Sequence, residues 1–135
     1  MDDFLLFVGM PGVYQTTRPK TGYKKIYCSK YRDALSIEFS AIAELEIPTD
    51  SIIVKTTTSK LRTNQAIVKS IKSISDDAVI DETCVCYSIW DNSFMYRTGK
   101  TVYPRGELNI DSNDPCGSGI NFFNSEEKAK NYKNF

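Results

Sequence analysis

The feature that most constrains the fold is the alternation of apolar and acidic residues in AIAELEIP, residues 41–48. The odd-numbered residues are apolar and share one side of an extended chain, whereas Glu44 and Glu46 face the other side. Pro48 ends the run, because proline has no N–H group for strand pairing. The pattern predicts a β-strand with one buried face.

Further short runs, rich in β-branched and aromatic residues and closed by turn residues, predict more strands. The predicted strands cover residues 4–9, 41–47, 52–56, 66–71, 84–89, 94–97, 101–103 and 120–123. The turn residues Thr98-Gly99-Lys100 predict a hairpin that joins 94–97 to 101–103. Such a series of strands is typical of a mainly antiparallel sheet.

Two segments resemble helices. Residues 30–41 (KYRDALSIEFSA) have mixed apolar spacing, and residues 124–135 (NSEEKAKNYKNF) begin with Asn124 as a candidate N-cap and Glu127 at capping-box spacing. We therefore expect one α+β domain over residues 1–135. It would be a compact, mainly antiparallel β domain with a C-terminal helix and one further helix.

The chain is electrically balanced, with 17 basic and 17 acidic side chains in 135 residues. A net charge of zero gives no global field that would draw the protein to nucleic acid or an anionic membrane. No apolar run approaches the roughly 18 residues of a membrane span, and residues 1–12 carry acids where a signal peptide is basic. We expect a soluble protein that is not secreted and has no membrane partner.

Histidine is absent from the chain, which removes the commonest general base and metal ligand. The cysteines Cys28, Cys84, Cys86 and Cys116 lack the C-x₂₋₄-C spacing of structural zinc sites. We expect all four to be reduced, and we expect no metal and no cofactor. Trp90 is expected to be a core or hairpin anchor.

The motif CGSGINFF, residues 116–123, raises the question of a phosphate-binding loop. Such loops place glycines immediately before a helix, whose free N–H groups bind the anion. Here Gly117 and Gly119 precede a predicted strand, and the helix follows only after Phe123. We expect these glycines to provide a positive φ angle or a close backbone approach at the start of the strand.

Basic residues are sorted away from acids in two segments. Residues 13–32 and 51–75 contain eleven lysines and arginines and no acid, and tyrosines recur every fourth residue in the first segment. If the segments adjoin, they form a cationic face with aromatic platforms for phosphates or bases; the alternative is a solvated lysine-rich surface. The candidate ligand-binding residues are Tyr23, Lys24, Lys25, Lys60, Arg62 and Arg97.

Five segments carry a resemblance to a known family. They are GYKK (22–25), AELEIPTDS (43–51), SKLRTNQAIVKSI (59–71), YRTGKTVYP (96–104) and CGSGINFFNSEEKAKNY (116–132). In this order they resemble an uncharacterised domain that is widespread in giant DNA viruses and also occurs in phage and bacterial proteins, often beside pentapeptide repeats. The resemblance implies a viral origin, with the host cytoplasm or the virion as location, and implies no activity. Family members have a histidine where this chain has Asn121, so any chemistry that needs that histidine is not expected here.

We expect a non-enzymatic binding or interaction domain of a virus or phage that engages a nucleotide-like or other anionic ligand, or a host protein. One alternative is a small structural component of the virion whose apolar strand edges pair with other chains, as a virion protein or a homo-oligomer. A transferase that uses a nucleotide cofactor is less expected, because no base or nucleophile constellation is visible. Convergent basic residues would favour binding, and a bare sheet edge would favour assembly.

Overall fold

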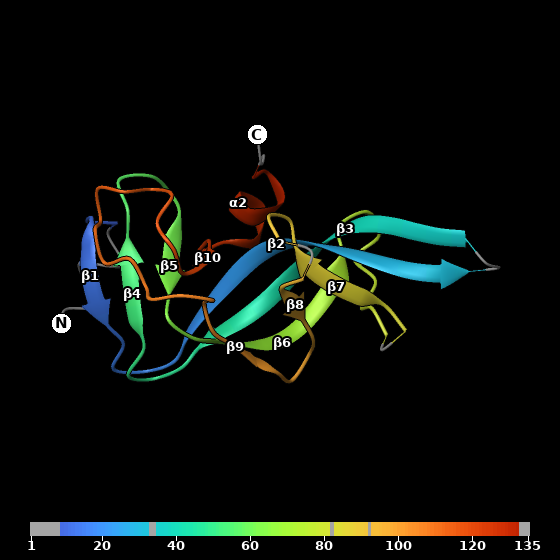
Figure 1. Ribbon diagram of the computed structural model, residues 1–135, viewed down its shortest axis with the longest axis horizontal. Helices are drawn as coiled ribbons and strands as arrows, with labels where there is room; N and C mark the ends of the chain where they lie inside the picture. Colours follow the sequence, from blue (N-terminus) through green and yellow to red (C-terminus); the bar gives the residue numbers. More distant parts are fainter. Residues whose placement is uncertain (1–8, 33–34, 82, 92, 133–135) are drawn as a thin grey trace.

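The computed structural model describes residues 9–32, 35–81, 83–91 and 93–132 (Figure 1). The described residues form two antiparallel sheets and one short helix. In chain order the elements are β1 (Gly12–Gln15), β2 (Lys20–Arg32), β3 (Leu35–Ile47), β4 (Ile52–Lys55), β5 (Leu61–Thr63), β6 (Ala66–Ser73), β7 (Val85–Ser88), β8 (Met95–Tyr96), β9 (Thr101–Val102), β10 (Ile120–Phe122) and α2 (Glu126–Lys130). The predicted strand at 4–9 lies outside the described residues except for Gly9.

The larger sheet has six strands in the order β8-β7-β2-β3-β6-β9. At its centre, β2 and β3 form a hairpin whose pairing runs from Lys20–Ile47 to Arg32–Leu35. The predicted helix at 30–41 is therefore wrong, because this segment ends β2 and begins β3. The apolar alternation of 41–47 extends back through Phe39, Ile37 and Leu35, a period of two that favours a strand.

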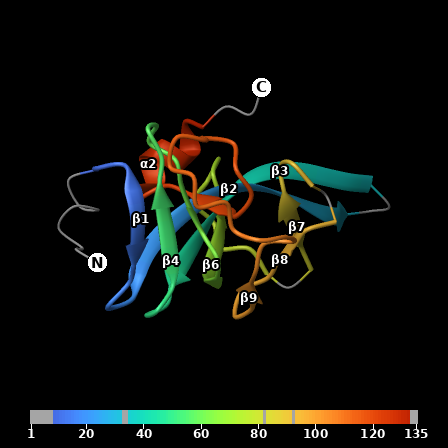
Figure 2. The same cartoon turned by 60° about the vertical axis from the view of Figure 1, so that its left-hand side comes forward.

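The smaller sheet has four strands in the order β1-β4-β5-β10. Its last strand leads directly to the larger sheet, since the N–H groups of Tyr23 and Phe123 each donate to the other's carbonyl at 2.8 Å. Figure 2 shows that β1 leads into β2, and that β3 leads into β4, at the same end of the molecule. This junction places β10, and the helix after it, against the first half of β2.

The predicted hairpin between 94–97 and 101–103 is wrong in its pairing. The turn forms, with Gly99 at φ +88°, but β8 pairs with β7 and β9 pairs with β6. The two strands thus lie at opposite ends of the strand order. The six-stranded sheet curves so strongly that the four residues between β8 and β9 connect its two ends. The same curvature encloses the main core, which includes Ile26, Ala43, Leu45, Val68 and Ile71.

The C-terminal helix is confirmed at residues 126–130, but its cap differs from the prediction. Ser125, not Asn124, is the N-cap: its backbone is extended and its hydroxyl accepts from the Lys128 N–H at 3.2 Å. The helix buries Ala129 against Ile42 and Phe123, on the face of the larger sheet away from the main core. With five helical residues the fold is β-rich rather than α+β. Among the described residues, no helix is long and apolar enough to cross a membrane.

The glycine prediction at the start of the last strand is confirmed. Gly119 has φ +150°, and a Cβ atom there would lie 2.7 Å from Leu108 Cδ1. A Cβ on Gly117 would likewise lie 2.7 Å from Asn109. Position 119 therefore favours glycine for both backbone and packing reasons, and position 117 does so because of the close approach of Asn109.

Two other sequence predictions are corrected. Trp90 is 58% exposed in the turn after β7, so it is no core anchor. Cys28 and Cys86 form a disulfide with a Cα–Cα distance of 4.0 Å, whereas Cys84 and Cys116 are free. The reason is register: β2 pairs with β7 so that Cys28 lies directly opposite Cys86.

Candidate functional site

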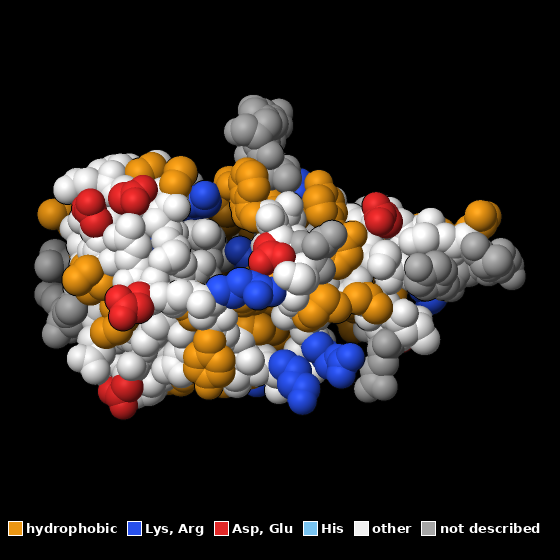
Figure 3. Space-filling model, viewed as in Figure 1, with side chains coloured by type: hydrophobic (Ala, Val, Ile, Leu, Met, Phe, Trp, Pro, Cys, Tyr) orange, Lys and Arg blue, Asp and Glu red, His pale blue; other side chains and the backbone are white. Residues whose placement is uncertain are grey.

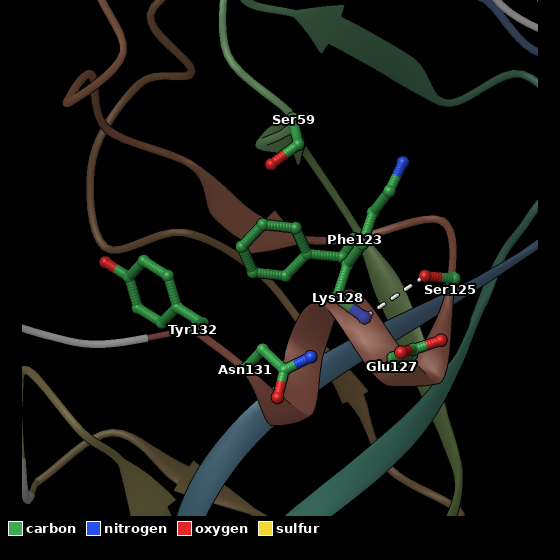
Figure 4. Close-up of a pocket in the computed structure, with 7 residues that line it drawn as sticks. All are labelled: Ser59, Phe123, Ser125, Glu127, Lys128, Asn131 and Tyr132. Carbon is green, nitrogen blue, oxygen red and sulfur yellow. Dashed lines mark hydrogen bonds between the residues drawn. The ribbon is translucent and has the colours of Figure 1, made fainter.

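An open groove of about 560 Å³ lies between α2 and the turn that joins β4 to β5 (Figure 4). Its lining combines two aromatic rings, two hydroxyls, an amide, a carboxylate and a lysine. The lining residues are Ser59, Phe123, Ser125, Glu127, Lys128, Asn131 and Tyr132. The turn provides Ser59, and the segment from the end of β10 through α2 provides all the others.

The aromatic part of the groove consists of Phe123 and Tyr132. Their ring centroids are 5.4 Å apart and their planes are inclined by 47°. Phe123 is fixed by its two main-chain hydrogen bonds to Tyr23, and Tyr132 is held by Lys25, whose Nζ donates to the Tyr132 carbonyl at 3.2 Å. The rings offer an apolar surface for a planar group.

Lys128 lines the groove, Lys25 and Lys60 contact Tyr132, and Lys24 and Lys55 lie near Lys60 and Lys128 respectively. We call these five residues the lysine cluster. Lys60 Nζ lies 5.0 Å from the centroid of the Tyr132 ring. Lys24 Nζ donates to the carbonyl of Asn121 at 2.9 Å. Figure 3 shows basic side chains next to apolar ones in the region of α2.

Two pairs within the lysine cluster lie close enough for their charges to repel each other. Burial and, second, the charge of Lys60 lower the pKa of Lys24 to about 8. Burial and, second, the charge of Lys128 lower the pKa of Lys55. Burial is the larger cause in both cases, and the second cause indicates that Lys24 lies near Lys60 and that Lys55 lies near Lys128.

No member of the lysine cluster forms an ion pair within the described ranges. The ion pairs there involve other cations: Lys30, Lys72, Arg105 and Lys130. Among the residues that line the groove, Glu127 is the one carboxylate and Lys128 is the one lysine. A bound anion would therefore provide the compensation that the chain's described side chains do not.

Replacing Lys24 with methionine should change the pH dependence of stability. The folded pKa of about 8 lies below the ordinary value of 10.5, so the unfolded parent binds more protons between these pH values. The free-energy cost of burying the charged Lys24 amine is present in full below pH 8 and is relieved as the pH rises to 10.5. Parent stability, relative to Lys24→Met, should therefore increase across this window by up to roughly 3 kcal/mol.

Urea unfolding of both proteins at pH 7, 9 and 10.5 measures this difference. The exposed lysine of β6, Lys69, gives a matched control, because Lys69→Met should follow the parent at every pH. Parallel stability curves for the parent and Lys24→Met would show that the amine is not desolvated.

Arg62 was predicted as a phosphate ligand, and the structure places its side chain inside the protein, 0% exposed. Its Nε donates to the carbonyl of Asn109 at 2.7 Å, and its two terminal nitrogens donate to those of Asp114 and Asp111 at 2.6 Å. The guanidinium thus organises the loop at residues 106–119 as a bound cation would. Its nitrogens are thus engaged by the protein's own main chain.

The other predicted residues fall into two places. Lys25 and Lys60 contact Tyr132, and Lys24 lies near Lys60. Tyr23 packs beneath α2 with Phe123. Arg97 lies in the exposed turn between β8 and β9, on the side of the molecule opposite α2 in both ribbon views. The two basic segments therefore adjoin in part.

Sequence reasoning missed the helix side of the groove, because Phe123, Lys128 and Tyr132 were not among the candidate binding residues. The signal was the lysine-rich sequence EEKAK directly after the aromatic strand. Within the described residues, no group of three or more histidine, cysteine, aspartate or glutamate side chains could hold a metal ion.

Comparisons with known proteins match residues 4–129 to the family of unknown function DUF5758. Three relatives come from Acanthamoeba polyphaga mimivirus. Uncharacterized protein L223 is 38% identical over 90% of this chain and 88% of that protein. Uncharacterized protein L812 is 33% identical over 89% and 85%, and Uncharacterized protein L227 is 40% identical over 69% and 59%.

No solved structure matches the chain significantly. The relatives confirm the expected similarity to an uncharacterised family of giant viruses. Occurrence in phage and bacterial proteins beside pentapeptide repeats stays a prediction.

Proposed function

This chain belongs to the family of unknown function DUF5758, and we propose that the groove beside α2 binds an anionic ligand that carries a planar ring, such as a nucleotide. The observation that supports this most is the lysine cluster. Burial and the nearby charge of Lys60 lower the pKa of Lys24, and burial and the charge of Lys128 lower the pKa of Lys55. None of the five lysines has an acidic partner among the described residues. An anion placed among them gains attraction and relieves repulsion.

The arrangement suits a ligand with two chemically different ends. Its ring would lie against Phe123 and Tyr132, because aromatic side chains stack with bases without regard to sequence. Its phosphates would lie toward Lys60 and Lys128, which reach the groove from opposite walls, the β4–β5 turn and α2. The hydroxyls of Ser59 and Ser125 offer neutral hydrogen-bonding groups between these ends.

Glu127 would contribute selectivity. It lies next to Lys128 in the lining and would repel a phosphate placed against it. The ligand's phosphates are therefore expected between Lys60 and Lys128, nearer to Lys60 and the turn than to Glu127. The proposed role is binding, without a catalytic step. The location of the protein in the host cytoplasm or the virion stays a prediction.

Binding to a panel of ATP, GTP, cyclic dinucleotides, short oligonucleotides and pyrophosphate tests the proposal, by the shift in melting temperature and by calorimetry. The double variant Lys60→Ala/Lys128→Ala should lose roughly 1.5–3 kcal/mol of binding free energy per charge-assisted contact. Its fold should survive, because exposed charges add little stability. Binding by the parent should weaken as salt rises.

The matched control is Lys69→Ala/Lys100→Ala, which removes two exposed lysines outside the groove. It should bind as the parent does. A panel in which no ligand shifts the melting temperature, or in which both double variants lose affinity equally, would refute the groove as the site.

A further inference from the structure

The central hairpin extends beyond the rest of its sheet. Strand β7 pairs with β2 only at residues 26–29, and β6 pairs with β3 only from Ala41 onward. The pairing of β2 with β3 continues to Arg32 and Leu35, so the end of the hairpin projects from the body (Figure 1). We call the segment Leu35–Phe39 of β3 the arm edge, since no described strand lies beside it.

The arm edge exposes apolar side chains, whereas a strand that faced only water would be expected to carry polar ones. Leu35 is 69% exposed and Ile37 is 46% exposed. Both project from the same face as Phe39, which packs against the main core at the base of the arm. A two-stranded ribbon is marginally stable in water, and its unpaired N–H and C=O groups are a template for another strand.

The arm-edge sequence, Leu-Ser-Ile-Glu-Phe, reads the same in both directions in its alternation of apolar and polar residues, with Ile37 at the centre. We propose that the arm edge pairs, antiparallel and centred on Ile37, with the arm edge of a second copy of this chain. A two-fold contact requires a self-complementary patch, and this symmetry provides it.

The backbone is positioned for this register. The carbonyl of Ser40 points to the outer side of β3, where it accepts from the N–H of Ile74 at 3.1 Å. Since bonding groups alternate along a strand, Ser36 and Glu38 also direct their N–H and C=O groups outward. Ser36 then exchanges two hydrogen bonds with Glu38 of the second copy, and the symmetric pair adds two more.

The side chains fit the same register. Leu35 lies opposite Phe39 of the second copy, and Ile37 lies opposite its own counterpart in a pair without hydrogen bonds, where side chains approach most closely. Glu38 lies opposite Ser36, so no like charges meet. The contact is isologous and closes as a dimer rather than extending into a fibre.

Cysteine cross-linking tests both the contact and its register. In a Cys116→Ser background, which removes the exposed free thiol, Ile37→Cys should form a covalent dimer under mild oxidation. Leu35→Cys should not, because its counterpart lies opposite residue 39. Ile110→Cys, at an isoleucine that is 64% exposed elsewhere, is the control and should stay monomeric.

Analytical ultracentrifugation without cross-linking gives the second measurement. The parent should be a dimer, and Ile37→Lys or Ser36→Pro should raise the dimer dissociation constant by about tenfold or more, a change of about 1.4 kcal/mol. The proline removes an outward N–H and spares the bonds to β2. A parent that is monomeric at every concentration, an Ile37→Lys variant that dimerises like the parent, or equal cross-linking at residues 37 and 110 would overturn the proposal. None of these outcomes depends on the groove.

Discussion

Replacing Arg62 with methionine should lower the free energy of unfolding by roughly 3–5 kcal/mol. The guanidinium is fully buried and donates to three main-chain carbonyls, those of Asn109, Asp111 and Asp114. Methionine fills much of the same volume but donates nothing, so three carbonyls of the loop at 106–119 lose their partners. A Cβ on Gly119 would lie 3.1 Å from Arg62 Cβ, so the space around the side chain is tight.

Chemical denaturation measures this loss, and hydrogen exchange locates it. Amides of residues 109–119 should exchange faster in Arg62→Met than in the parent. Arg62→Lys should fall between them, because a single ammonium cannot match the three-way geometry of a guanidinium. Arg97→Met, at an exposed arginine, is the control; an Arg62→Met variant as stable as Arg97→Met would contradict the structural role.

Removing the disulfide should have a comparable effect. Cys28 and Cys86 are 58 residues apart in sequence, and closing a loop of that length in the unfolded chain is worth about 4 kcal/mol in the chain-entropy description. The double variant Cys28→Ala/Cys86→Ala should be destabilised by about that amount. Both side chains are buried, so their alanine replacements also lose packing contacts.

Thiol titration of the unfolded protein gives the first check, with two free thiols expected and not four. Unfolding with and without a reductant gives the second, and Cys116→Ser should leave both transitions unchanged. Four free thiols in the purified native protein, or a parent that is indifferent to reductant, would contradict the bond.

The strands that were predicted from sequence share a local signal. Residues 41–47, 52–56, 66–71 and 120–123 lie within or across β3, β4, β6 and β10, because alternation, β-branching and flanking turn residues are properties of each segment alone. The last helix was found through its acidic first turn. Strand pairing is different, since it depends on segments far apart in the chain.

The wrong predictions concern features that depend on residues far apart in the chain. Residues 30–32 and 35–41 pair within the central hairpin, in which thirteen consecutive residue pairs join β2 to β3. The register of β2 with β7 brought Cys28 to Cys86, which no spacing rule for zinc or secretion could indicate. The residues between β8 and β9 are typical of a hairpin turn, yet the two strands do not pair and lie at opposite ends of the strand order of the larger sheet.

The candidate site shows the same division. The two acid-free segments indicated a basic surface, and Lys24, Lys25 and Lys60 do converge. Arg62 belongs to the same segment, but its side chain is buried under the loop at 106–119 and is bonded to that loop's carbonyls. The helix wall of the groove comes from the opposite end of the chain, so only the fold could add Lys128 and Tyr132 to the site.

The most direct test of the groove as a ligand site is an NMR titration of ¹⁵N-labelled protein with ATP. The account predicts that shift changes concentrate at the amides of Ser59, Lys60 and residues 123–132, and that they saturate. It also predicts that they diminish in Lys60→Ala/Lys128→Ala and with added salt. Unchanged spectra with every nucleotide of the panel, or changes confined to residues 93–105 at the other end of the fold, would contradict it.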